Sequence, residues 1–199
     1  MIKLYVMTTL IVFGIMVSQC NQKKANNSTN SIDTTIRIDI PLPKTIEEGK
    51  KMIENMVEKL RNDTSSKQPN MALYKQSALT YDKFAEAFPN DSQTIDYLFK
   101  SAELHRSLKE FDVAVTIYEK IVKSVTANSK QANCLFLMGF TYENELNQKE
   151  KAKQYYNEFL EKYPKHELIE SVKFSLKNID KPMEEIIKEF EQKNKINKK

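Results

Sequence analysis

Glycine is scarce in this sequence, and so are proline, cysteine, histidine and tryptophan. Among 199 residues there are three glycines, six prolines, two cysteines, two histidines and no tryptophan. A β-sheet protein of this size needs more turn-forming residues, so the composition favours helices. The length is enough for one domain with a real core, and too short for us to expect two.

Neither sign of charge dominates the chain. Its 31 Lys and Arg residues are balanced by 27 Asp and Glu residues, and the two kinds are largely interleaved. Interleaved charge is typical of solvated helix faces. We therefore expect no dedicated nucleic-acid surface.

The same scarcities argue against a reaction centre. Beyond the first twenty residues only Gly49 and Gly139 remain, so no glycine-rich loop can hold a phosphate. His105 and His166 belong to different helical units, and no H-E-x-x-H motif or paired-cysteine spacing occurs. We predict no catalytic residue, no metal site and no cofactor, and we expect His105 to be a hydrogen-bonded structural histidine.

One long apolar run stands near the N-terminus. Lys3 is followed by "LYVMTTLIVFGIMV", residues 4–17, which carries no charge. Fourteen residues of helix span about 21 Å, which is less than the roughly 30 Å of a membrane's hydrocarbon layer. A charged start, a short apolar run and then small or polar residues are typical of a secretory signal.

The apolar run ends in "VSQC", residues 17–20, which resembles the signal of bacterial lipoproteins. Gln19 stands where that family has Gly, Ala or Ser. The resemblance implies that Cys20 is lipidated and that the protein is an outer-membrane lipoprotein facing the periplasm. Two or more acyl chains would make such an anchor stable. A plain cleaved signal that leaves Cys20 unmodified, and an uncleaved anchor helix, remain alternatives.

If Cys20 is acylated, Cys134 has no disulfide partner within the chain. Cys134 lies in "ANCLFLMGF", where apolar helix positions flank it. We predict that it is a small buried hydrophobic residue and not a reactive thiol.

A polar stretch separates the signal from the rest of the chain. "NQKKANNSTNSIDTT" has almost no apolar side chain, so it cannot bury itself and is predicted to be a flexible tether. "IRIDIPLP", residues 36–43, alternates like a strand, but Pro41 and Pro43 confine it to a sheet edge or an extended segment. We expect it to lie along the folded body, or alternatively in the body's own groove. The predicted division is a signal at 1–19, a tether and extended segment at 20–44, and a helical domain at 45–199.

A pattern of one aromatic and two apolar residues is written three times in the helical part. "TYDKFAEAFP", "IYEKIVKSVT" and "YYNEFLEKYP" align on Tyr81, Tyr118 and Tyr156, at intervals of 37 and 38 residues. In each copy, apolar residues follow the tyrosine at i+3 and i+7, which share one helix face. A fixed period of this length indicates stacked supersecondary units.

Small residues accompany the second and third copies. Ala114 and Ala152 stand four residues before the tyrosine, and the preceding amphipathic helices carry Ala102 and Gly139. Small side chains on both helices of a pair permit a close crossing, whereas larger ones would force the helices apart.

These positions resemble the tetratricopeptide repeat. Residues 135–164 match best, and 97–126 match well, with His105 in place of the usual Tyr; the first copy is degenerate. The resemblance covers about residues 46–192. It implies an all-α fold, a right-handed α–α superhelix of about four helical hairpins. No hairpin can bury its apolar face alone, so stability must come from stacking, with the last hairpin as a terminal cap.

The pattern and its caps predict eight helices. Thr45 and Glu48 form a capping box at the first start, and Asp180 with Pro182 marks the last. The predicted ranges are 45–61, 70–88, 92–107, 110–124, 129–145, 148–163, 166–178 and 182–193.

In tetratricopeptide-like arrays the first helix of each pair lines the concave surface. Phe136 and Phe140 are one turn apart and lie off the predicted core face, so they are candidate anchors for a partner. The alternative is that both pack under the N-terminal segment or a neighbouring helix. By matched position, the resemblance implies eight partner-binding residues: Asp96, Phe99, Glu103, Arg106, Asn133, Phe136, Phe140 and Glu143.

The leading hypothesis is a non-catalytic, lipid-anchored scaffold that binds another envelope protein or peptide. In outline the chain resembles the lipid-anchored repeat proteins of outer-membrane assembly. An alternative is a structural module that binds peptidoglycan or another glycan, helped by the lysine-rich end "QKNKINKK". An enzyme whose site no motif reveals is a third hypothesis.

Overall fold

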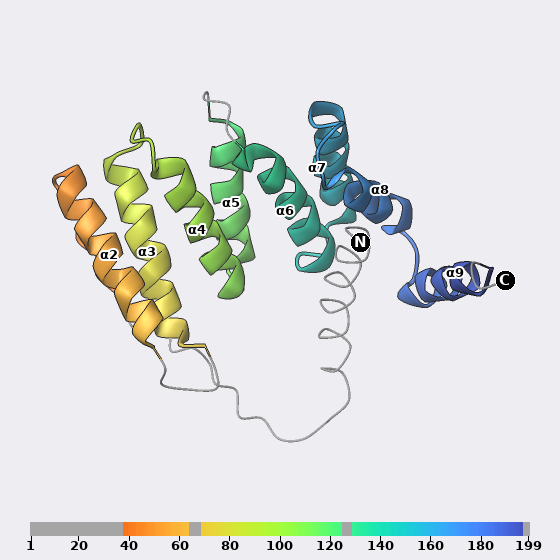
Figure 1. Ribbon diagram of the computed structural model, residues 1–199, viewed down its shortest axis with the longest axis horizontal. Helices are drawn as coiled ribbons and strands as arrows, with labels where there is room; N and C mark the ends of the chain where they lie inside the picture. Colours follow the sequence, from red (N-terminus) through yellow and green to blue (C-terminus); the bar gives the residue numbers. More distant parts are fainter. Residues whose placement is uncertain (1–37, 64–68, 125–128, 197–199) are drawn as a thin grey trace, which may run out of the picture. The chain divides into compact units, whose positions relative to one another are not determined.

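The computed structural model describes residues 38–63, 69–124 and 129–196, with side chains up to residue 192. These residues form eight α-helices and no strand, so the predicted all-α solenoid of helical hairpins is confirmed for them (Figure 1). The predicted signal, Cys20 and the predicted tether lie outside the described residues. The helices are α2 (Ile46–Asn62), α3 (Met71–Ala87), α4 (Thr94–Ser107), α5 (Phe111–Val122), α6 (Lys130–Asn144), α7 (Lys149–Lys162), α8 (Ile169–Asn178) and α9 (Met183–Ile196).

All eight predicted helices are present, each within three residues of its predicted ends. The capping box at α2 is confirmed in its first half, because Thr45 Oγ1 accepts a hydrogen bond from the Glu48 N–H at 3.1 Å. The Glu48 carboxylate accepts from the Lys44 N–H, one residue before the expected donor, at 2.8 Å. At the last helix, Asp180 instead pairs with Lys153 of α7 at 3.0 Å.

Residues 38–43 form neither helix nor strand. Pro43 is buried, whereas Leu42 is exposed, so only part of this segment is covered. An extended segment, one of the two forms predicted for it, fits this better than a sheet edge.

The turns within the second and third hairpins use left-handed residues that are not glycine. Lys109 has a φ of 62° and Asn147 a φ of 52°. After α4 the Glu110 N–H donates to the His105 carbonyl at 2.9 Å, which closes a Schellman motif. After α6 the turn is one residue longer, and the Gln148 N–H donates to the Tyr142 carbonyl at 2.7 Å. These turns set each α4–α5 and α6–α7 pair antiparallel.

Each helix from α2 to α7 packs on the next one in the sequence, and α4 also contacts α6 (Figure 1). The buried apolar side chains form two clusters. The larger one has sixteen buried residues, from α4 to just after α8, and includes Tyr118 and Tyr156. The smaller one joins α2, α3 and α4 through five residues: Ile53, Met56, Tyr81, Phe84 and Tyr97. All three repeated tyrosines are therefore buried, as the pattern predicted.

The close helix crossing predicted from the small residues is confirmed. Ala102, Ala114 and Ala152 have no exposed surface. A Cβ added to Gly139 would lie 2.5 Å from Cε1 of Tyr156, which is closer than real Cβ contacts come. Gly49 plays the same part in the first hairpin, where a Cβ would lie 2.7 Å from the Phe84 ring. The sequence pattern did not reveal this role of Gly49.

His105 is a buried structural histidine, as expected, and it joins three helices. Its side chain is 3% exposed; Nε2 lies 3.0 Å from an Asp82 oxygen of α3, and Nδ1 lies 2.5 Å from a Glu110 oxygen at the start of α5. Lys75 of α3 donates to the Glu110 carboxylate at 2.6 Å. Ser101 donates to Asp82 at 2.5 Å. We call these five residues the His105 network.

The last two helices, predicted to form a terminal cap, leave apolar side chains exposed. On α9, Met183, Ile187 and Phe190 are 65%, 50% and 36% exposed. On α8, Phe174 is 50% exposed. These exposed apolar side chains do not suit the predicted terminal cap, whose outer face is ordinarily polar.

Gly139→Ala is expected to destabilise the protein. In an exposed helix this change would stabilise by about 1 kcal/mol, but here the new methyl group would strike the buried Tyr156 ring, and overpacking costs about 1–3 kcal/mol. Urea denaturation gives the free energy of unfolding. Adding Tyr156→Leu should reduce the cost of the alanine in a double-mutant cycle. A more stable Gly139→Ala variant would contradict the close crossing.

The stability of the protein is expected to fall as the pH rises above neutrality. Burial alone would lower the pKa of His105, but its hydrogen bonds to Asp82 and Glu110 outweigh burial and raise that pKa above the ordinary 6.5. The stabilisation is complete below 6.5 and is lost as the pH rises through the raised pKa. Denaturation curves from about pH 6 to pH 9 should show this decline, and His105→Gln should flatten it. If the stability of the His105→Gln variant declines with pH as steeply as that of the wild type, groups other than His105 cause the decline.

Candidate functional site

The eight predicted partner-binding residues lie on α4 and α6, the first helices of the second and third hairpins. Because α4 contacts α6, the structure brings the two rows onto neighbouring helices. Asp96 is exposed and the other seven are half-buried. The rows are Asp96, Phe99, Glu103 and Arg106 on α4, and Asn133, Phe136, Phe140 and Glu143 on α6.

A lysine that the sequence analysis did not single out links the two rows. Lys130, the first residue of α6, places its Nζ 3.6 Å from an Asp96 oxygen. The same Nζ lies 5.2 Å from the centroid of the Phe99 ring, within cation–π range. The part of the α4 row that holds Asp96 and Phe99 is therefore a surface that α4 and α6 form together.

The three phenylalanines of these rows are half-buried, and two of them belong to the core packing. The Phe136 ring lies 6.3 Å from that of Phe140 and 6.3 Å from that of Tyr156, and the Phe99 ring lies 6.1 Å from that of Tyr118. Phe99 and Phe136 also pack against the larger core cluster. For Phe136 the structure agrees with the alternative that it packs on a neighbouring helix, because its ring contacts Tyr156 of α7. Phe140 does not belong to that packing layer.

Two of the predicted residues satisfy the buried tyrosine hydroxyls. Tyr118 donates to Glu103, and Tyr156 donates to Glu143 at 2.8 Å. Burial raises the pKa of Glu143, and the Tyr156 hydrogen bond only partly offsets this rise. Burial raises the pKa of both tyrosines, and the neighbouring carboxylates raise it further. Glu103 and Glu143 therefore hold α4 to α5 and α6 to α7, whatever else they bind.

Arg106 is the one predicted residue with an unsatisfied buried atom. Its Nε lies 3.5 Å from a Glu103 oxygen, close enough for an ion pair, but it makes no hydrogen bond. Its side chain is 22% exposed. The buried Nε therefore faces Glu103 and is not open to a partner, so only the exposed part of the Arg106 side chain can meet one.

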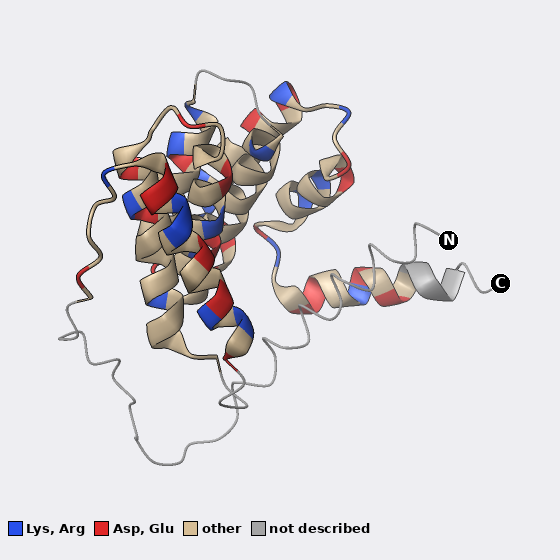
Figure 2. Ribbon diagram, turned by 60° about the vertical axis from the view of Figure 1, so that its left-hand side comes forward, with Lys and Arg blue, Asp and Glu red and all other residues tan. Residues whose placement is uncertain are grey.

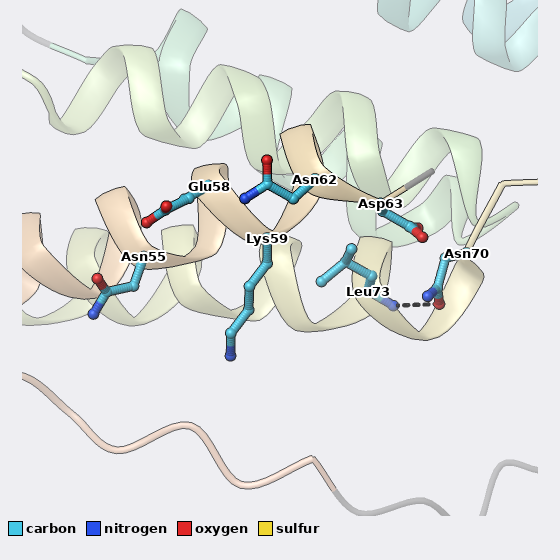
Figure 3. Close-up of a pocket in the computed structure, with 7 residues that line it drawn as sticks. All are labelled: Asn55, Glu58, Lys59, Asn62, Asp63, Asn70 and Leu73. Carbon is cyan, nitrogen blue, oxygen red and sulfur yellow. Dashed lines mark hydrogen bonds between the residues drawn. The ribbon is translucent and has the colours of Figure 1, made fainter. Parts of the chain in front are cut away.

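A polar hollow lies between α2 and the start of α3 (Figure 3). Its volume is about 560 Å³. Figure 3 shows Asn55, Glu58 and Lys59 along α2, with Asn70 and Leu73 across from them. The Asn70 side chain is already engaged, because it accepts from the Leu73 N–H at 3.1 Å and caps α3.

A larger groove lies between α3 and α5, with α4 beneath it, and its volume is about 820 Å³. We call it the α3–α5 groove. Neither this groove nor the polar hollow contains any of the eight predicted residues, so the sequence analysis missed both. The sequence held a partial signal for the α3–α5 groove. Val113 is apolar, but as the neighbour of Ala114 it lies off the helix face that Ala114 turns toward the core. The apolar lining comes mainly from Ile95, Leu98, Val113 and Ile117.

The described residues offer little for chemistry. No three His, Cys, Asp or Glu side chains within them are grouped so as to hold a metal ion. Cys134 is fully buried, as predicted, and burial raises the pKa of its thiol to about 12, so it stays protonated at neutral pH. Acidic and basic residues are mixed along the helices (Figure 2). None of the helices described is both long and apolar enough to cross a membrane.

Two segments of the chain match a family model, that of the tetratricopeptide repeat. The matched residues are 96–125 and 133–166. They contain all of α5 and α7, and all of α4 and α6 except their first residues. They correspond to the two better copies of the pattern, while the degenerate first copy is not matched. No curated protein is significantly similar to the chain.

Proposed function

We propose that this chain, a tetratricopeptide-repeat protein by its two matched segments, is a non-catalytic scaffold that binds another protein or a peptide in the bacterial cell envelope. Tetratricopeptide repeats generally mediate protein–protein interactions. The observation that carries the proposal is the paired rows on α4 and α6. There, half-buried phenylalanines and the half-buried Arg106 lie on two helices that contact each other.

Aromatic residues and arginine dominate the binding energy of many interfaces, because they offer large contact areas together with directed polar groups. Phe140 and Arg106 are the best candidates for anchors. Phe140 contacts Phe136 but is not part of the core layer, and the Arg106 side chain remains 22% exposed beside Glu103. Phe136 packs on the core cluster and contacts Phe140 from that side.

The envelope location is part of the proposal and rests on the first twenty residues. Lys3, the apolar run and Cys20 fit a lipoprotein signal. Cys20 would carry the lipid, and the polar stretch after it would let the helical domain reach a partner away from the membrane surface. The more specific proposal is a role in envelope biogenesis. It rests on the general organisation that this chain shares with the lipid-anchored repeat proteins of outer-membrane assembly.

The interaction surface can be tested by affinity capture from envelope extract with residues 21–199 as bait. Phe140→Ala with Arg106→Ala is expected to lose the specific partner, because truncating anchors of this kind typically costs about 2–4 kcal/mol. Phe174→Ala is the matched control, an exposed phenylalanine on α8 away from the rows. Thermal melts should show that all three baits are folded. Equal capture by the three baits would remove the rows on α4 and α6 as the binding site.

The glycan-binding alternative is tested with the same bait and isolated sacculi. The polar hollow offers the free amide groups of Asn55 and Asn62, which suit sugar hydroxyls. Depletion of the bait by isolated sacculi, lost on Asn55→Ala with Asn62→Ala, would favour a glycan-binding module over a protein scaffold.

Cys20→Ser is expected to abolish fatty-acid labelling and to release the protein from the membrane fraction. Serine has no thiol to receive the lipid, and the polar tether alone has no membrane affinity. Metabolic labelling with a palmitate analogue, followed by fractionation, measures both effects. Cys134→Ser serves as the control, since the buried thiol is not accessible. A labelled, membrane-bound Cys20→Ser protein would refute the lipid anchor.

A further inference from the structure

The first hairpin, α2 and α3, stands at one end of the array and meets the rest mainly where α3 packs on α4 (Figure 1). The apolar part of that contact is the smaller core cluster. In it the Tyr97 ring stacks on Tyr81 at 5.4 Å and meets Phe84 edge-on at 4.8 Å. Among the described residues, α2 and α3 contribute no side chain to the larger cluster. The repeats from α4 to α7 therefore have a core of their own.

The polar part of the α3–α4 contact is the His105 network, and its geometry calls for a protonated imidazole. Nε2 faces an Asp82 oxygen at 3.0 Å, and Nδ1 faces a Glu110 oxygen at 2.5 Å. A neutral imidazole has one N–H, so its other nitrogen would turn a lone pair toward a carboxylate, whereas the imidazolium donates at both positions. The His105 side chain is 3% exposed, so water has little access to replace a lost partner.

The charged groups around His105 come from α3 and from the start of α5. Asp82 and Glu110 face the ring directly, and Lys75 acts through Glu110, to which it donates at 2.6 Å. Helix α6 also contacts α4, but within the described residues none of its side chains bonds or pairs with His105. Two positive and two negative charges balance while His105 is protonated. Loss of its proton breaks a hydrogen bond and leaves one negative charge unbalanced at the same contact.

We infer that protonated His105 is a latch that holds the first hairpin on the repeats from α4 to α7. When His105 loses its proton, α2 and α3 open as a unit while α4 to α7 stay folded. The pH dependence is thus confined to one hairpin, and it does not depend on what the rows on α4 and α6 bind.

The direction of the pH effect follows from the two states of the latch. Burial lowers the pKa of His105 in the closed state, but the hydrogen bonds to Asp82 and Glu110 outweigh burial and raise that pKa above the ordinary 6.5. Opening returns the ring to water and to its ordinary pKa. The latch therefore has its full effect below pH 6.5. From there to the raised pKa, the opening equilibrium constant rises by up to about tenfold per pH unit.

Hydrogen–deuterium exchange of residues 21–199, which include every described helix, tests the latch from about pH 6 to pH 9. Peptide mass spectrometry gives protection factors for each helix after correction for the intrinsic pH dependence of exchange. The protection of α2 and α3 should fall by up to about tenfold per pH unit above pH 6.5. The protection of α6 and α7 should change by less than about twofold.

Three variants separate the latch from a general effect of pH. His105→Gln cannot titrate, so α2 and α3 should keep at every pH the low protection that the wild type shows at about pH 9, while α6 and α7 report that the variant is folded. Asp82→Asn removes one carboxylate from a side chain that is 30% exposed, so the fall with pH should be smaller. His166→Gln is the matched control, since His166 is the other histidine of the chain and lies between α7 and α8.

Protection of α2 and α3 that does not change with pH would overturn the inference. An equal fall in α6 and α7 would do the same, because the whole domain would then be unfolding. The latch is also refuted if His105→Gln or Asp82→Asn keeps the wild-type profile, or if α2 and α3 in His105→Gln keep the protection that the wild type has at about pH 6. Loss of the pH dependence in His166→Gln would assign it to the wrong histidine.

Discussion

A buried tyrosine needs two things from the helix that it packs on, a small residue beneath its ring and an acceptor for its hydroxyl. Tyr156 finds both on α6, because Gly139 makes room for the ring and Glu143, one turn further on, accepts the hydroxyl hydrogen bond at 2.8 Å. Leaving a buried hydroxyl unpaired costs about 1–3 kcal/mol. The crossing of α6 and α7 is thus fixed by size and by hydrogen bonding together, and Tyr118 with Glu103 repeats the second condition at α4 and α5.

This constraint also shapes the surface that a partner would meet. The carboxylates that satisfy the tyrosines project from the same rows as Phe140 and Arg106, so two charged groups of that surface are already engaged within the chain. A partner gains little from approaching them. The groups that remain are the half-buried phenylalanines and the exposed part of the Arg106 side chain, which favour a ligand with an apolar side chain beside an acceptor group.

The elements that the sequence predicted depend on local spacing. Thr45 with Glu48 marked a helix start, and the tyrosines at a fixed period marked the hairpins, because cap and face positions recur within one or two turns. The features that were missed join residues distant in the chain. Asp82 reaches His105 from the previous hairpin, 23 residues away, and no pattern on either helix reveals that pair. The exposed stripe of α9 was also not foreseen, because periodicity shows that a face is apolar and does not show what covers it.

The division of the core into two clusters matters if the protein is held at Cys20 while a partner pulls on α4 and α6. Force would then pass through the helices in series. It would reach α2 and α3 first, because they follow the predicted tether in the chain. Their cluster has five buried residues against sixteen in the larger one. The His105 network ties α3 to α4 and α5 across that division. Tension would therefore have to break this network before the repeats that carry the proposed binding rows began to unfold.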